Sequence, residues 1–125
     1  MGRNLYFKRA ERVGDLIKRE VSEMLIRGIK DPRVGLVTIT RVRLSDDLRL
    51  AKVFFSVMGS EEDRTRNLQG LNSAKGFIKR EIGKRTHLRY VPDIVFKFDP
   101  SVEYADHLDR LIKEINREER TREEQ

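Results

Sequence analysis

The sequence predicts one α+β domain in which helices cover one face of a three-stranded mixed sheet. First, 125 residues are a common size for a single domain. Second, runs with helical spacing of apolar residues alternate with short runs rich in β-branched and aromatic residues. Third, a turn signal joins the first two strand-like runs, whereas helical residues separate the second from the third. A turn gives antiparallel pairing and a helical connection gives a right-handed parallel crossover, so we expect strand order 1-2-3.

The first helix is predicted by a stripe of apolar residues that ends near Gly28. Steps of three and four positions place on one face Ala10, Val13, Ile17, Val21, Met24 and Leu25. Glycine commonly follows the last turn of a helix, and Asp31 followed by Pro32 prevents continuation. We therefore expect an amphipathic helix that ends at Gly28 or shortly after.

Two strands joined by a tight turn are expected within residues 36–58. The turn signal is Ser-Asp-Asp at residues 45–47, so the flanking runs should form a hairpin. In the second run, Leu50 and Phe54 lie on one face, and the opposite face contains Ala51, Val53, Phe55 and Val57. Apolar residues on both faces are typical of a central strand.

The first strand carries a change of parity. Its apolar residues are odd-numbered at Val37 and Ile39 but even-numbered at Val42 and Leu44. Side chains alternate between the two faces of a strand, so this change requires one extra residue. We expect a β-bulge at residues 40–41.

An interrupted helical segment is expected after Ser60. Ser60 with Asp63 three positions later is a capping pattern, and acidic residues fill the positive first turn. Helical spacing continues through Leu71 to the Ala-Lys-Gly run at residues 74–76, and it resumes with Phe77, Ile78 and Ile82. Glycine at 76 can adopt dihedral angles that redirect the second helix against the first.

A third strand and a last helix complete the predicted domain. Pro92 prevents a helix, and alternating Ile94, Phe96 and Phe98 indicate the strand. Asp-Pro-Ser at residues 99–101 then caps a helix whose stripe contains Ala105, Leu108, Ile112 and Ile115. From residue 116 onward there is no apolar stripe. We therefore expect a domain at residues 1–115 and a polar tail at residues 116–125 that is frayed or disordered.

Basic charge is concentrated in residues 75–90. The net charge is +6, and this segment holds six basic residues and one acidic residue, whereas residues 91–106 hold one basic and four acidic residues. Such asymmetry indicates a polyanionic partner, although a solvated, salt-bridged surface gives the same pattern. Cysteine is absent, which excludes disulfides and thiolate metal sites. No apolar run approaches the length of a membrane span, so we expect a cytoplasmic protein.

The helix predicted after residue 74 places its cations on one face. At about 100° per residue, one arc contains Lys75, Lys79, Arg80 and Lys84, with Gly76 and Gly83 at its centre. A sugar-phosphate chain can approach the backbone where side chains are missing and meet the surrounding cations. Close crossing by a neighbouring helix is the alternative reason for two glycines. Arg85 lies off this arc, and Arg89 follows the helix.

A resemblance to the ribosome-binding factor A family is carried by RVGDLIKREVSEML, DPRVGLVTITRV and LNSAKGFIKREIGKRTHLRYVPDIVFKFD, and it covers about residues 6–115. The resemblance implies a KH-type fold of the second topology, in which an Ala-x-Gly kink replaces the usual Gly-x-x-Gly loop. Ala74 and Gly76 occupy the positions of that kink. It further implies a bacterial factor that binds the small (30S) ribosomal subunit and its 16S rRNA. Such a factor supports late maturation and processing of the 16S rRNA 5′ end, matters in cold adaptation and leaves before translation.

Cations outside the basic segment extend the list of candidates. Lys8, Arg9 and Arg12 begin the first helix and either enlarge the basic patch or are simply solvated. Arg41 and Arg43 share one strand parity and face solvent or RNA, unless an acidic cross-strand neighbour holds them. The full set of predicted RNA-binding residues is Lys75, Lys79, Arg80, Lys84, Arg85, Arg89, Arg41, Arg43, Lys8, Arg9 and Arg12.

Catalysis and metal binding are not predicted. The sequence has no phosphate-binding glycine loop, no nucleophile elbow and no His-Glu-x-x-His. His87 and His107 lack partners at ligand spacing, and Asp46 and Asp47 are typical turn formers. We therefore expect no cofactor, no metal and no small-molecule substrate. No exposed aromatic ladder is evident, and Tyr90 is the one aromatic residue within the basic segment.

The predicted function is that of a non-catalytic, RNA-binding assembly factor, and nothing in the sequence requires more than a monomer. Two alternatives remain open at this point. A protein-interaction module would dock a partner through the first or last helix, with positive charge serving solubility only. A generic nucleic-acid-binding KH-like domain would bind duplex DNA as well as ribosomal RNA.

Overall fold

The computed structural model describes the backbone of residues 2–124 and the side chains of residues 8–101 and 107–123. Its elements, in chain order, are α1 (Gly2–Arg27), β1 (Val37–Leu44), β2 (Leu50–Val57), α2 (Glu61–Ser73), α3 (Lys75–Arg85), β3 (Asp93–Phe98) and α4 (Ser101–Glu124). The sheet order is β1-β2-β3, with β1 and β2 antiparallel and β2 and β3 parallel. The predicted α+β fold and strand order are confirmed.

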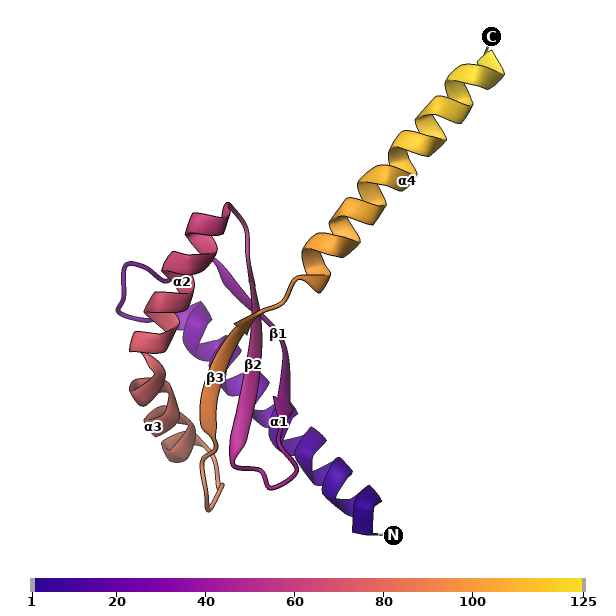
Figure 1. Ribbon diagram of the computed structural model, residues 1–125. Helices are drawn as coiled ribbons and strands as arrows, with labels where there is room; N and C mark the ends of the chain where they lie inside the picture. Colours follow the sequence, from indigo (N-terminus) through magenta and orange to yellow (C-terminus); the bar gives the residue numbers. More distant parts are fainter. Residues whose placement is uncertain (1, 125) are drawn as a thin grey trace.

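Helices cover one face of the sheet. Figure 1 shows α1 passing behind the three strands, with α2 and α3 on the β3 side. The side chains that fill the layer between helices and sheet include Ile17, Val21, Phe55, Leu71, Ile78 and Ile82, each fully buried. Along each strand, the residues that face the helices alternate with residues of the opposite face, and the latter are more exposed. We call this opposite face the open sheet face.

The predicted β-bulge is confirmed at Thr40. Ile39 pairs with Phe55 and Arg41 pairs with Phe54, so Thr40 is the extra residue in β1. After the bulge, Val42 faces the core. Arg41 and Arg43 therefore lie on the open sheet face. Without a bulge, regular alternation would place them on the same side as Ile39.

Two glycines are required by the local geometry, one at the end of α1 and one in α2. Gly28 adopts a φ of 95°, and its N–H donates to the carbonyl of Met24 at 3.1 Å, which confirms the predicted end of α1. Gly70 of α2 has a role that the sequence pattern does not reveal. A Cβ at this position would lie 2.7 Å from Cγ2 of Val34, so the α1–β1 loop can approach α2 this closely only at a glycine.

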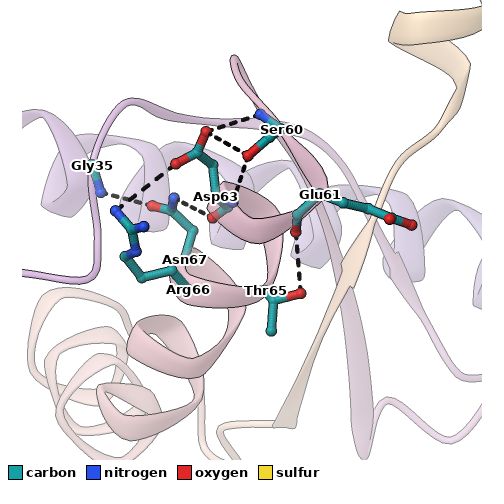
Figure 2. A network of polar contacts seen from close by, with 7 residues as sticks. All are labelled: Gly35, Ser60, Glu61, Asp63, Thr65, Arg66 and Asn67. Carbon is teal, nitrogen blue, oxygen red and sulfur yellow. Dashed lines mark hydrogen bonds and ion pairs between the residues drawn. The ribbon is translucent and has the colours of Figure 1, made fainter.

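The start of α2 is held by a capping box. The N–H of Asp63 donates to Oγ of Ser60 at 3.3 Å, and the N–H of Ser60 donates to Oδ2 of Asp63 at 2.8 Å, as predicted. Figure 2 shows the next turn, where buried Asn67 accepts from the N–H of Gly35 at 2.7 Å and donates to the carbonyl of Asp63. Asn67 thus attaches the α1–β1 loop to α2.

The last helix does not join the layer formed by α1, α2 and α3. Figure 1 shows α4 projecting away from the sheet. Of the predicted apolar stripe, Leu108, Ile112 and Ile115 are 40% to 54% exposed, as is Leu111, whereas the side chain of Ala105 lies outside the described residues. Residues 116–124 continue this helix. The division between domain and tail near residue 116 stays a prediction.

Candidate nucleic-acid interface

The break between α2 and α3 lies at Ala74. Its φ of −84° and ψ of −3° are in the right-handed region, and its N–H donates to the carbonyl of Gly70 at 3.0 Å. The side chain of Ala74 is buried, so the bend turns a small residue toward the core. Gly76 lies inside α3 without a positive φ, in contrast to Gly28 and Gly59. The dihedral freedom expected of Gly76 is therefore not used, because the bend is complete before it.

The surface of α3 around Gly76 is open. Within 4 Å, a Cβ at Gly76 would meet only Nη1 of Arg80, at 3.7 Å. A Cβ at Gly83 would make an ordinary contact with Cγ2 of Val91, at 3.4 Å. Neither glycine is thus placed for a close helix crossing, which was the alternative explanation for them. The backbone at Gly76 is accessible to a ligand.

Several predicted α3 cations already have acidic partners. Nζ of Lys79 lies 2.6 Å from Oδ1 of Asp93, and this hydrogen bond raises the pKa of the Lys79 ammonium. Nζ of Lys84 lies 3.8 Å from Oε1 of Glu81, and the Lys84 side chain is still 74% exposed. Arg85 contacts Oε2 of Glu81 at 3.2 Å and Oε2 of Glu20 at 4.0 Å. Arg85 thus joins α3 to α1, away from the basic arc.

Three cations of the basic segment have no carboxylate partner among the side chains that the structure describes. They are Lys75, Arg80 and Arg89, and the last two are exposed. With the weakly paired Lys84, they leave the basic side of α3 able to accept phosphates. The other predicted cations lie elsewhere. The N-terminal turns of α1, with Lys8, Arg9 and Arg12, extend past the β1 side of the sheet, whereas α3 lies on the β3 side (Figure 1).

Arg41 and Arg43 lie on the open sheet face with other cations. The residue directly opposite Arg41 is Phe54 and the residue directly opposite Arg43 is Lys52, so neither faces an acidic residue across the strands, although Asp99, which follows β3, does hold Arg41. The guanidinium of Arg41 lies over the Phe54 ring, 4.2 Å from its centroid, and Nε lies 3.5 Å from Oδ2 of Asp99. The sequence pattern already places Phe54 on the face of β2 opposite the core, and this was the signal that could have predicted its contact with Arg41.

Asp99 is a buried carboxylate with a structural role. It accepts from the N–H of Ser101 at 3.0 Å and from Oγ1 of Thr40 at 2.7 Å, and only 3% of its side chain is exposed. The hydrogen bonds with Ser101 are the largest cause, followed by the bond with Thr40, and together they lower the pKa of Asp99 from 3.8 to about 2. Asp99 thereby joins the bulge in β1 to the start of α4.

We expect Asp99 to make stability fall in acid. Its pKa is lower in the folded protein than in the unfolded chain, so ionised Asp99 stabilises the fold above about pH 4, and this contribution is lost as pH falls to about 2. Urea unfolding at several pH values should show that Asp99→Asn costs most near neutral pH and progressively less in acid. A cost that does not change with pH would contradict this role.

No metal site or membrane-spanning helix is found in the part of the chain that the structure describes. No group of three His, Cys, Asp or Glu side chains is placed to hold a metal ion there. No described helix is long and apolar enough to cross a membrane.

A three-stranded sheet of this order, with a helix–break–helix unit between β2 and β3 and a basic α3, defines a KH-like α+β protein. The family model "Ribosome-binding factor A" matches residues 9–112. The chain belongs to the ribosome-binding factor A family.

Individual relatives agree with this membership. Ribosome-binding factor A of Geotalea daltonii is 53% identical over 109 residues, covering 87% of this chain and 89% of the relative. The crystal structure of ribosome-binding factor A from Thermus thermophilus is 27% identical, with a TM-score of 0.60, and the match covers 70% of this chain and 93% of that one. A model of the Thermus thermophilus factor, fitted into a cryo-EM map of a 30S complex, is 28% identical, with a TM-score of 0.56, over 68% of this chain and 89% of that one.

Proposed function

We propose that this chain is a non-catalytic assembly factor that binds the immature 30S subunit through its 16S rRNA, with the basic side of α3 as a contact surface. Family membership supports this proposal, as does the fitting of the Thermus thermophilus relative into the map of a 30S complex. The site of action is the cytoplasm, and the consequence of binding is late maturation, including processing of the 16S rRNA 5′ end. Binding would bias rRNA folding through different affinities for different conformers.

The open backbone at Gly76 is the observation that carries the assignment of α3. A phosphate can come close to the helix there, because Gly76 has no side chain and the nearest neighbouring side chain, that of Arg80, is itself a cation that can bind the phosphate. Lys75, Arg80 and Lys84 surround this position, and Arg89 follows α3 in the chain. Lys8, Arg9 and Arg12 belong to α1, a different element, so we assign them no part in this contact.

A substitution at Gly76 tests this assignment, because it separates stability from binding. Gly76→Leu should leave the free energy of unfolding unchanged or raise it by up to about 1 kcal/mol, since leucine favours helix and the site is open. The same variant should bind 30S subunits roughly tenfold more weakly, because its side chain fills the space near the backbone. Co-sedimentation with purified 30S subunits measures the affinity, and Gly76→Ala serves as the smaller matched change.

Salt dependence tests the electrostatic part of the proposal. Four phosphate contacts should make log K fall against log salt with a slope of roughly −3 to −4 at constant magnesium. A flat dependence together with full binding by Gly76→Leu would refute the α3 assignment and favour docking through a protein surface. Equal affinity for duplex DNA and 30S subunits would favour a generic nucleic-acid-binding domain.

A further inference from the structure

We infer that the open sheet face is a second nucleic-acid-binding surface, one that takes unpaired bases of single-stranded RNA by stacking on the Arg41–Phe54 pair. This inference goes beyond the proposed function, which assigns only the basic side of α3. The two surfaces belong to different elements, so each can be tested without the other.

The charge of the open sheet face indicates a polyanion. Register places Arg43, Lys52 and Val95 in one row across the strands, and Arg41, Phe54 and Lys97 in the next row. Both rows therefore carry two cations each. Arg43, Lys52 and Lys97 are exposed, and no carboxylate pairs with them among the described side chains. Arg43 and Lys52 lie directly opposite each other, and like charges in that position destabilise a sheet unless an anion is present, so this arrangement favours an anionic ligand.

The centre of the same face holds a guanidinium in a fixed position. The Phe54 ring lies beneath Arg41, at 4.2 Å from centroid to Cζ, and Asp99 holds Nε from one side at 3.5 Å. Asp99 is itself fixed by Thr40 and Ser101, so it cannot easily turn away. The Arg41 side chain nevertheless stays 45% exposed. A planar guanidinium that is fixed and still accessible is a surface on which a base can stack.

Single strands fit this face better than duplexes. Stacking requires a base with a free face, which a duplex offers only at its ends, whereas each base of a single strand is available. Three further cations flank the Arg41–Phe54 pair: Arg43 on β1, Lys52 on β2 and Lys97 on β3. They can contact the phosphates on either side of a stacked base. The bulge at Thr40 creates the arrangement, because it brings both arginines to the face that carries Phe54.

Binding of a fluorescein-labelled oligouridylate of about ten nucleotides, followed by anisotropy, tests the inference. Phe54→Leu keeps an apolar side chain but removes the ring, and Arg41→Lys keeps the charge but removes the plane. Each should weaken binding about tenfold, as expected for loss of one stacked base. Arg19→Lys is the matched control, because Arg19 is exposed on α1, away from the open sheet face, and should bind within about twofold of the wild type. Thermal unfolding by circular dichroism establishes that each variant is folded.

Amide chemical shifts of the wild type give a second test that needs no variant. Adding the oligouridylate should move resonances of β1, β2 and β3 on the open sheet face more than those of α3. The inference is overturned if the wild type does not bind the oligonucleotide, or if a duplex RNA of equal length binds as tightly. It is also overturned if shifts concentrate on α3, or if Arg41→Lys and Arg19→Lys weaken binding equally. Loss of 30S binding in α3 variants has no bearing on these outcomes, so the two proposals fail separately.

Discussion

Deletion of Val42 is expected to destabilise the domain by more than about 4 kcal/mol. The bulge brings Val42 to the core side of β1, between Arg41 and Arg43 on the open sheet face. Without Val42, either one of these arginines turns toward the core or Ile39 leaves it. A buried guanidinium without a partner costs several kcal/mol in the first case, and loss of Ile39 and Val42 from the core costs a similar amount in the second. Urea unfolding followed by circular dichroism measures the loss.

Two changes at Thr40 are the controls for that deletion. The first, Thr40→Ala, keeps the chain length and the bulge, and it removes only the hydrogen bonds of Oγ1, to Asp99 at 2.7 Å and to the carbonyl of Phe54 at 3.3 Å. Loss of a hydrogen bond to a charged group should cost about 1.5–3 kcal/mol. The second, deletion of Thr40, shortens β1 but keeps every strand pair, so it should cost about as much as Thr40→Ala. If deletion of Val42 costs no more than deletion of Thr40, the alternation of β1 does not hold the fold.

Reversal of charge on α3 should weaken 30S binding roughly 100-fold near physiological salt, because the change removes two phosphate contacts and replaces them with repulsion. The variant is Lys75→Glu/Arg80→Glu. Both positions lack a carboxylate partner among the described side chains, so no ion pair of the described fold is lost. Glutamate is a good helix former, and at residue 75 it lies in the favourable first turn of α3. The free energy of unfolding should therefore change little.

A change of equal net charge on α4 separates a local contact from a general effect. Lys113→Glu/Arg117→Glu alters two exposed residues of the projecting helix. Quantitative co-sedimentation should find its binding to 30S subunits several-fold weaker at most. If both double variants lose affinity equally, only net charge matters, and the α3 assignment is wrong. If the α3 variant binds like the wild type, the contact lies on another surface of the chain.

The two proposed surfaces differ in what they offer an RNA. The side of α3 has exposed cations near open backbone, which suits phosphates of folded rRNA. The open sheet face has a fixed guanidinium over a ring, which suits an unpaired base. Lys79, paired with Asp93, lies where α3 meets the start of β3. An immature subunit contains both folded helices and strands that are not yet paired, so a factor with both surfaces could contact each kind at once.

Local sequence determined most of the architecture. The end of α1 at Gly28, the capping box of Ser60 and Asp63, and the bulge at Thr40 each depend on residues within a few positions of one another. Periodicity of apolar residues then defined which face of α1 and of each strand is buried, although the stripe of α4 is exposed, and the connections determined the strand order. The resemblance of the chain to its family rests on the same segments, and family membership confirmed it.

Tertiary structure alone decided which cations are available. Lys79 and Arg80 are neighbours in sequence, yet only Lys79 meets a carboxylate, because Asp93 at the start of β3 is within its reach. Arg85 is held by Glu20 of α1, and Arg41 is fixed between Phe54 and Asp99. These partners are far apart in the chain, and no periodic pattern encodes their distances. Ion pairs and ring contacts form only once packing has placed the elements that carry them, so the sequence could propose the basic residues but not choose among them.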